Sequence, residues 1–231
     1  MKENNRIYKS IRNSTYAILG QIITIALNFI SRTIFIHTLG AIYLGINGLF
    51  TNILSVLSFA ELGFSTAIIY EMYAPLANND KKRVASLMNF YSKVYKYIGS
   101  SIFIIGIFLI PYLHFFIKDP SIIPANLPPL WIIFLLFLLN TSASYFFSYK
   151  RSIIVASQNS YIDSINQMEF NIIRNILQIS VLFFFKSFVS FLIIQLVCTF
   201  LSNVFISIKA NKLYPYPVSY THLTLPTNSL V

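Results

Sequence analysis

Charged residues are scarce in this sequence. Only 10% of the 231 residues are Asp, Glu, Lys or Arg, against roughly 25% in a typical soluble domain. Hydrophobic residues make up 56% of the chain, and the mean hydropathy is +0.67. They fall in runs of about 20, the length of a helix that crosses a bilayer. These features exclude an ordinary soluble domain and predict an all-α integral membrane protein.

Cysteine and catalytic motifs are also lacking. Cys198 is the single cysteine, which excludes an internal disulfide and a Cys-rich metal site. The sequence has no GxSxG, P-loop or HExxH motif, and its histidines, His37, His114 and His222, are scattered. We therefore predict that the chain is not an enzyme and binds no cofactor or metal.

The apolar runs predict six transmembrane helices in one domain, residues 1–212. The expected spans are 16–36, 46–70, 98–117, 130–149, 165–185 and 188–208. The third span should kink at Pro111, because proline interrupts helical hydrogen bonding. The fifth is the least apolar, with seven polar or charged side chains in its first fourteen residues.

The distribution of positive charge predicts the orientation. Thirteen of the 17 Lys and Arg residues fall in the segments on the N-terminal side of the membrane, whereas only Lys118 and Lys186 fall in the opposite loops. Basic residues concentrate on the cytoplasmic side of membrane proteins, so both termini should be cytoplasmic. The net charge of +10 thus follows from topology, and we expect membrane lipids rather than nucleic acid as partners.

The segment 71–97 between the second and third spans has a helical pattern of its own. Asn79 or Asp80 can cap a helix, and apolar residues recur at helical spacing at Val84, Leu87, Met88, Tyr91 and Tyr95. We interpret it as an interfacial helix leading into the third span. The alternative is an ordinary solvated loop.

The last residues do not resemble the rest. The stretch VSYTHLTLPT at 218–227 looks like translated adapter or vector sequence. We therefore interpret 213–231 as a non-native tail and expect that the native chain was cut short near Pro217.

Polar side chains form helical stripes in three of the expected spans. They recur every three or four residues at Gln21, Thr24, Asn28 and Ser31 in the first span, at Asn47, Thr51, Ser55, Ser58, Glu61 and Ser65 in the second, and at Gln167, Asn171, Arg174 and Gln178 in the fifth. Such stripes place polar groups on one face of each helix. They predict a shared hydrophilic cavity, with Asn28, Asn171 and Gln178 among its lining. The alternative is interhelical hydrogen bonding in a closed bundle.

Three charged residues lie inside expected spans, where an ionisable group normally faces a cavity or a partner. Arg32 and Glu61 should differ in depth by roughly 20 Å at 1.5 Å per residue, so we do not expect them to pair. Glu61 and Arg174 should lie at similar depth, and we predict that they form an ion pair or face each other across the cavity. Arg32 would then either snorkel to the outer surface or bind an anionic substrate, since guanidinium suits phosphate.

Residues 28–87 resemble the N-terminal portion of polysaccharide or O-antigen flippases of the Wzx type, in the multidrug/oligosaccharidyl-lipid/polysaccharide exporter superfamily. The similarity is strongest around Ser31-Arg32, Leu39-Gly40, Gly45, Gly48, Phe50 and Glu61-Leu62-Gly63, and extends more loosely to about residue 212. It implies two six-helix lobes around a central cavity in the bacterial plasma membrane. The implied activity is translocation of undecaprenyl-diphosphate-linked oligosaccharide for capsule or exopolysaccharide synthesis. Arg32 and then Arg174 are the implied binding cations, and the chain would be one lobe lacking its C-terminal partner.

Other functions remain open. A drug or cation antiporter of the same superfamily would favour a cavity centred on a carboxylate such as Glu61. A membrane glycan polymerase or ligase is less favoured, because the expected outer loops are short. A non-transporting subunit of a membrane assembly is a further alternative.

Overall fold

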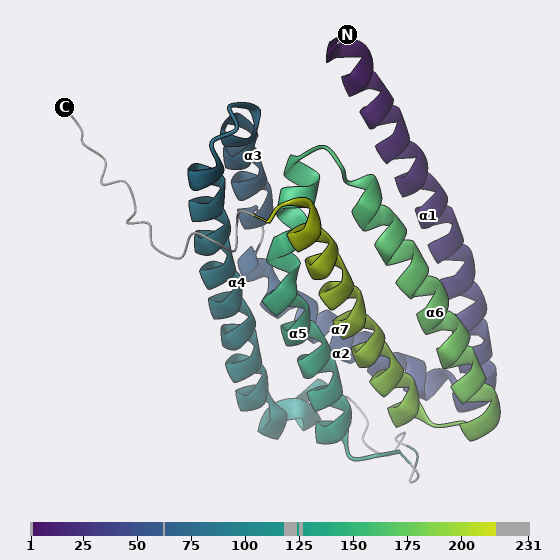
Figure 1. Cartoon of the computed structure of the whole chain (residues 1–231). Coiled ribbons are helices and arrows are strands. Elements are labelled where there is room, and N and C mark those ends of the chain that lie inside the picture. The colour runs from purple at the N-terminus through teal and green to yellow at the C-terminus, as the bar shows by residue number, and fades with distance from the viewer. Residues whose placement is uncertain (1, 62, 118–123, 125–126, 216–231) are drawn as a thin grey trace.

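The computed structural model describes residues 2–61, 63–117, 124 and 127–215, and in this part of the chain it contains helices and no strands (Figure 1). The helices are α1 (Lys2–Leu39), α2 (Ala41–Leu57), η1 (Ser58–Glu61), α3 (Phe64–Ala77), α4 (Lys81–Leu109), η2 (Ile110–Phe116), α5 (Leu130–Ala156), α6 (Tyr161–Phe185) and α7 (Phe188–Leu213). The prediction of an all-α protein is confirmed. Most of the expected tail, 216–231, lies outside the described residues.

Four helical segments are long and apolar enough to cross a membrane: Ile7–Leu39, Lys81–Phe116, Tyr161–Phe185 and Phe188–Leu213. A fifth is α5, whose two parts bend by 45° between Phe146 and Tyr149. Large apolar side chains are exposed along these helices, for example Ile18, Ile22, Ile25 and Phe29 on one face of α1. An apolar outer surface of this extent suits contact with lipid. The chain is therefore a multi-pass helical membrane protein.

The long helices stand side by side in the order α4, α5, α7, α6, α1 (Figure 1). The main packing partners are α1 with α6, α6 with α7, α7 with α5, and α5 with α4. Helix α2 runs obliquely across one face of this row. It is anchored near its start by Tyr43 against Phe188 and in its middle by Phe50 against Phe134, with ring centroids 5.4 and 5.2 Å apart.

The prediction of one continuous span over 46–70 is wrong. Helix α2 ends at Leu57, a 3-10 turn follows, and α3 begins after Gly63, whose φ is 85°. An L-residue with a side chain disfavours this left-handed backbone, which glycine adopts readily. The result is a 17-residue helix α2, about 25 Å long and shorter than the roughly 30 Å hydrocarbon core. Six spans are thus not confirmed, since the described residues contain four or five helical segments long and apolar enough to cross a membrane.

The segment before the third span is helical and leads into it, as predicted. From Lys81 onward it forms the first turns of α4, whereas residues 71–77 belong to α3. Asp80 caps it, because its Oδ1 accepts a hydrogen bond from the backbone N–H of Arg83 at 3.0 Å. The predicted apolar stripe packs into the bundle, with Val84, Met88, Tyr91 and Tyr95 buried.

The expected irregularity at Pro111 takes the form of a change in helix type. The α-helix ends at Leu109, and the 3-10 helix η2 begins at Ile110. Proline cannot donate to an α-helical hydrogen bond, which accounts for the change from α-helix to 3-10 helix next to Pro111.

Candidate functional site

Two cavities lie between the helices, on the side of the row that α2 crosses. The first, of about 500 Å³, is enclosed by η1, α3, α4, α5, α6 and α7, and the second, of about 380 Å³, by α1, α2, α6 and α7. Arg174, in the middle of α6, lines both of them. The two cavities therefore form neighbouring parts of one polar region, with a guanidinium at their boundary.

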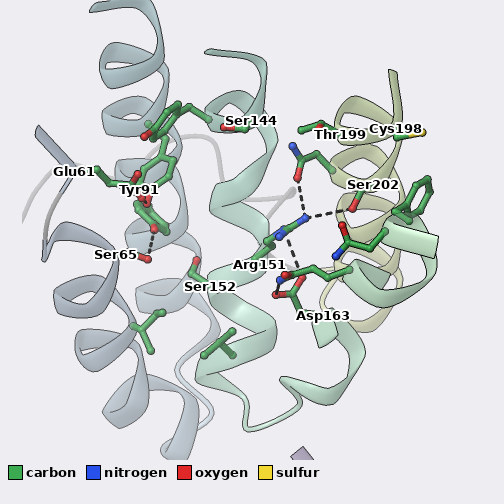
Figure 2. A pocket seen from close by; sticks show the side chains of 18 of the residues that line it. Glu61, Ser65, Tyr91, Ser144, Arg151, Ser152, Asp163, Cys198, Thr199 and Ser202 are labelled. Carbon is green, nitrogen blue, oxygen red and sulfur yellow. Dashed lines mark hydrogen bonds and ion pairs between the residues drawn. The ribbon is translucent and has the colours of Figure 1, made fainter. Parts of the chain in front are cut away.

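One wall of the first cavity is a network around Arg151 (Figure 2). Nη2 of Arg151, on α5, donates to Oδ1 of Asn203 at 2.9 Å and to Oγ of Ser202 at 3.4 Å, both on α7. Nε of Arg151 lies 3.5 Å from Oδ1 of Asp163 on α6. These two atoms make an ion pair without a hydrogen bond. Arg151 is thus held by three helices and neutralised by Asp163.

The opposite wall carries Glu61 among tyrosines (Figure 2). The Tyr95 hydroxyl donates to Oε1 of Glu61, and the Tyr91 hydroxyl lies 3.0 Å from Oγ of Ser65, to which it donates. The break between α2 and α3 brings Glu61 and Ser65 to α4. A tyrosine hydroxyl, rather than a cation, therefore bonds to this carboxylate.

Neutral amides position Arg174. Its Nη2 donates to Oδ1 of Asn171 at 2.6 Å, one turn earlier on α6. Nδ2 of Asn171 donates to Oγ1 of Thr24 on α1 at 3.3 Å. The chain from Thr24 through Asn171 to Arg174 connects two helices and leaves the guanidinium without a carboxylate partner among the described residues.

The second cavity carries Arg32, which is exposed and makes no hydrogen bond or ion pair with any residue that the structure describes. Asn28 is fixed beside it, since its Oδ1 accepts from Nδ2 of Asn175 at 3.4 Å. Gln178 is buried and donates through Nε2 to the carbonyl oxygen of Phe191 at 3.2 Å. Polar side chains of α1, α2, α6 and α7 therefore share this cavity with a cation that has no counter-ion among the described residues.

The structure brings the six residues singled out from the sequence to these two cavities. Glu61, Asn171 and Arg174 line the first, whereas Asn28, Arg32 and Gln178 line the second together with Arg174. Glu61 and Arg174 share a cavity but do not form an ion pair, within the part of the chain that is described. Of the two alternatives predicted for this pair, the geometry agrees with side chains that face a common cavity.

No family model, curated protein or solved structure matches this chain. Functional inference therefore depends on the geometry of the two cavities.

Sequence reasoning missed the network of Arg151, Asp163, Ser202 and Asn203. The expected fourth span ends at residue 149, which places Arg151 in a loop. Helix α5 instead continues to Ala156 and carries Arg151 into the cavity wall. The sequence does contain an indication of this network. Arg151 and Asp163 lie near the adjoining ends of two consecutive helices, and antiparallel packing of such helices brings their adjoining ends together.

The side chains that line the site include groups that can bind an anion. No group of three His, Cys, Asp or Glu residues is placed to hold a metal among the described residues. The two cavities offer three guanidinium groups (Arg32, Arg151 and Arg174), the carboxylates of Glu61 and Asp163, several amides and several hydroxyls. Guanidinium and amide N–H groups bind the oxygens of an anion.

Proposed function

We propose that this chain is a membrane lobe of a transporter for an anionic, lipid-linked oligosaccharide, and that the anion is a diphosphate carried by undecaprenol in the bacterial plasma membrane. The observation that carries the proposal is the place of Arg174, which borders both cavities and, among the described residues, bonds only to the neutral amide of Asn171. Transport then needs no covalent chemistry.

Charge balance supports an anionic substrate. Burying a cation costs several kcal/mol unless an anion or hydrogen bonds compensate. Arg151 has Asp163 for this purpose, whereas the partly buried Arg174 has no carboxylate among the described residues. The exposed Arg32 has none among them either. A diphosphate passing between the cavities would meet these two guanidinium groups in succession.

The arrangement of the helix ends supports the proposed orientation. The start of α1, the start of α4, the α5–α6 turn and the end of α7 lie at one end of the bundle (Figure 1). Most of the Lys and Arg residues belong to these segments, so we assign this end to the cytoplasm. A second lobe of the same kind would cover the open side of the two cavities.

Direct binding tests the proposal. The purified chain in detergent is titrated with undecaprenyl diphosphate and with undecaprenol, which lacks the charge. We expect the diphosphate to bind at least tenfold more tightly, and Arg174→Gln to remove most of that difference, since a bidentate charged hydrogen bond is lost. Lys186→Gln, at the exposed α6–α7 turn, removes the same charge outside the cavities and should bind as wild type does. Equal affinity for the two lipids, or an unchanged Arg174→Gln variant, would overturn the proposal.

A cation antiporter is the second candidate, because Glu61 projects into the first cavity. It predicts that the chain binds a lipophilic cation such as tetraphenylphosphonium and that Glu61→Gln abolishes this binding. The diphosphate transporter predicts no such binding.

A further inference from the structure

A groove lies on the outer side of α5, between α4 and α7. It consists of two adjoining cavities of about 270 and 370 Å³, both of which are lined by Lys96, Tyr149 and Lys150. We call it the α5 groove and define it by Lys96 of α4, Ala143, Phe146 and Lys150 of α5, and Phe200 and Asn211 of α7.

The α5 groove is separate from the candidate transport site. No residue lines both the groove and either of the two cavities described above. On α5, Ser144 faces the first cavity and Phe146 faces the groove; at 3.6 residues per turn these positions lie about 200° apart around the helix. The groove therefore opens on the face of the bundle away from the transport site.

The groove is positively charged. Nζ of Lys150 donates to Oδ1 of Asn211 at 2.8 Å and lies 5.8 Å from the centre of the Tyr149 ring. Lys96 is exposed beside it. No Asp or Glu is among the described residues that line the groove. Two ammonium groups thus share one concave surface without a carboxylate to balance them.

The two lysines lie at the depth of lipid headgroups. A membrane span takes about 20 residues. Counting back by that number from the end of η2 at Phe116 reaches Lys96, and counting forward from the start of α5 at Leu130 reaches Lys150. Tyr97, adjacent to Lys96, is 75% exposed, as is typical of tyrosine at a membrane interface.

Away from the lysines, the second cavity of the α5 groove is lined mostly by apolar residues, with Ser207 as a polar exception. Ala143 and Phe146 precede Lys150 on α5 by one to two turns, and Phe200 lies opposite them on α7. Ala143 and the two phenylalanine rings line the same cavity of about 370 Å³. A basic mouth at headgroup depth above an apolar slot matches a molecule with a charged head and a hydrocarbon chain.

We infer that the α5 groove binds one anionic phospholipid, with its phosphodiester between Lys96 and Lys150 and an acyl chain in the slot formed by Ala143, Phe146 and Phe200. Basic pockets between transmembrane helices on the cytoplasmic side recognise anionic headgroups in this way. A water-soluble phosphate would leave the slot empty. A zwitterionic lipid would place its own positive charge next to the two lysines.

The test is a titration of the full chain, purified in detergent, with phosphatidylglycerol and with phosphatidylcholine of the same acyl chains. We expect tighter binding of phosphatidylglycerol. Lys96→Gln and Lys150→Gln should each weaken it about fivefold, and the double variant about thirtyfold, with phosphatidylcholine binding unchanged. The matched control is Lys93→Gln with Lys212→Gln, which removes two exposed charges from α4 and α7 outside the groove and should bind as wild type.

Additional variants and a competition measurement complete the test. If the glutamine variants do not fold, Lys96→Arg with Lys150→Arg should retain binding, and Ala143→Phe, which fills the slot and leaves both lysines, should lose it. Glycerol 3-phosphate should not compete. Equal affinity for the two lipids, equal losses in the control variant, or full competition by glycerol 3-phosphate would each overturn the inference.

Discussion

Arg174 and Asn171 lie one turn apart on α6, and Nη2 of the arginine donates to the amide oxygen of the asparagine over 2.6 Å. The amide nitrogen of Asn171 is directed to Thr24 of α1, so the oxygen is available to the guanidinium. One amide therefore orients the cation at the boundary of the two cavities without neutralising it.

Replacing Asn171 should weaken anion binding without removing the cation. We expect Asn171→Ala to lower the affinity for undecaprenyl diphosphate about tenfold, because Arg174 loses a charged hydrogen bond worth about 1.5–3 kcal/mol. Asn171→Asp should lower it further, since a carboxylate there would pair with Arg174 and compete with the ligand. Ser180→Ala, on the same helix but outside both cavities, serves as the control and should bind normally. Wild-type affinity in Asn171→Asp would contradict this role.

Glu61 and Arg174 should act independently in stability. Each has its own partner, Tyr95 for Glu61 and Asn171 for Arg174, and no ion pair joins them. In a double-mutant cycle with Glu61→Gln and Arg174→Gln, we expect the changes in unfolding free energy to add within about 0.5 kcal/mol. The measurement is unfolding in mixed micelles. A coupling energy above about 1 kcal/mol would show that the two charges interact directly.

The Arg151–Asp163 pair should contribute to stability because it lies between α5 and α6. The side chains are only 24% and 14% exposed, so Asp163→Asn leaves a largely covered cation with a neutral neighbour. We expect a loss of about 1–3 kcal/mol in unfolding free energy. Glu169→Gln removes an exposed carboxylate from the same helix and should change stability by less than about 0.5 kcal/mol. Similar losses in the two variants would mean that net charge, rather than this pair, matters.

The break between α2 and α3 can be tested at Gly63. No atom lies within 4 Å of the position that a Cβ would take there, so the effect of Gly63→Ala is purely one of backbone conformation. At a φ of 85° we expect a loss of about 1–2 kcal/mol, measured as a lower midpoint of thermal unfolding.

Gly45→Ala is the matched control. Gly45 lies inside α2 and also has no atom within 4 Å of a Cβ, so alanine there should stabilise the helix by about 0.5–1 kcal/mol. A neutral Gly63→Ala variant would show that the break can relax into a regular helix.

The sequence predicts the long helices well because length and apolar composition are local properties. The spans beginning near Leu130 and Phe188 agree with α5 and α7 at their first residues. The expected third span begins at residue 98, because Lys81–Arg83 and the residues after them are too polar for a membrane span, and the preceding segment is predicted as a helix capped by Asn79 or Asp80. A helix can nevertheless continue beyond the bilayer, and α4 does so.

Length and apolar composition do not predict the break in the second span. The apolar content of 46–70 is high throughout, and hydropathy is insensitive to backbone handedness. Gly63 indicates the break only once its φ is known. The hydrogen bond between Tyr95 and Glu61 also depends on this break, since it sets where η1 meets α4.

The candidate residues were found because polar stripes are visible in each helix separately. The hydrogen-bond partners of these residues cannot be found in this way. Pairs such as Asn175 with Asn28 and Arg151 with Asn203 join helices far apart in sequence, and a single sequence does not specify which helix packs on which.

The oblique course of α2 has a mechanical consequence. Its first residues follow α1 directly at Gly40, and its other end leads through η1 to Gly63 and α3. Both glycines have positive φ, at 100° and 85°. Separation of α1 and α6 from α3 and α4 would therefore rotate α2 as a rigid rod, with the change in direction absorbed at its two glycine ends. The width of the two cavities and the tilt of α2 would change together.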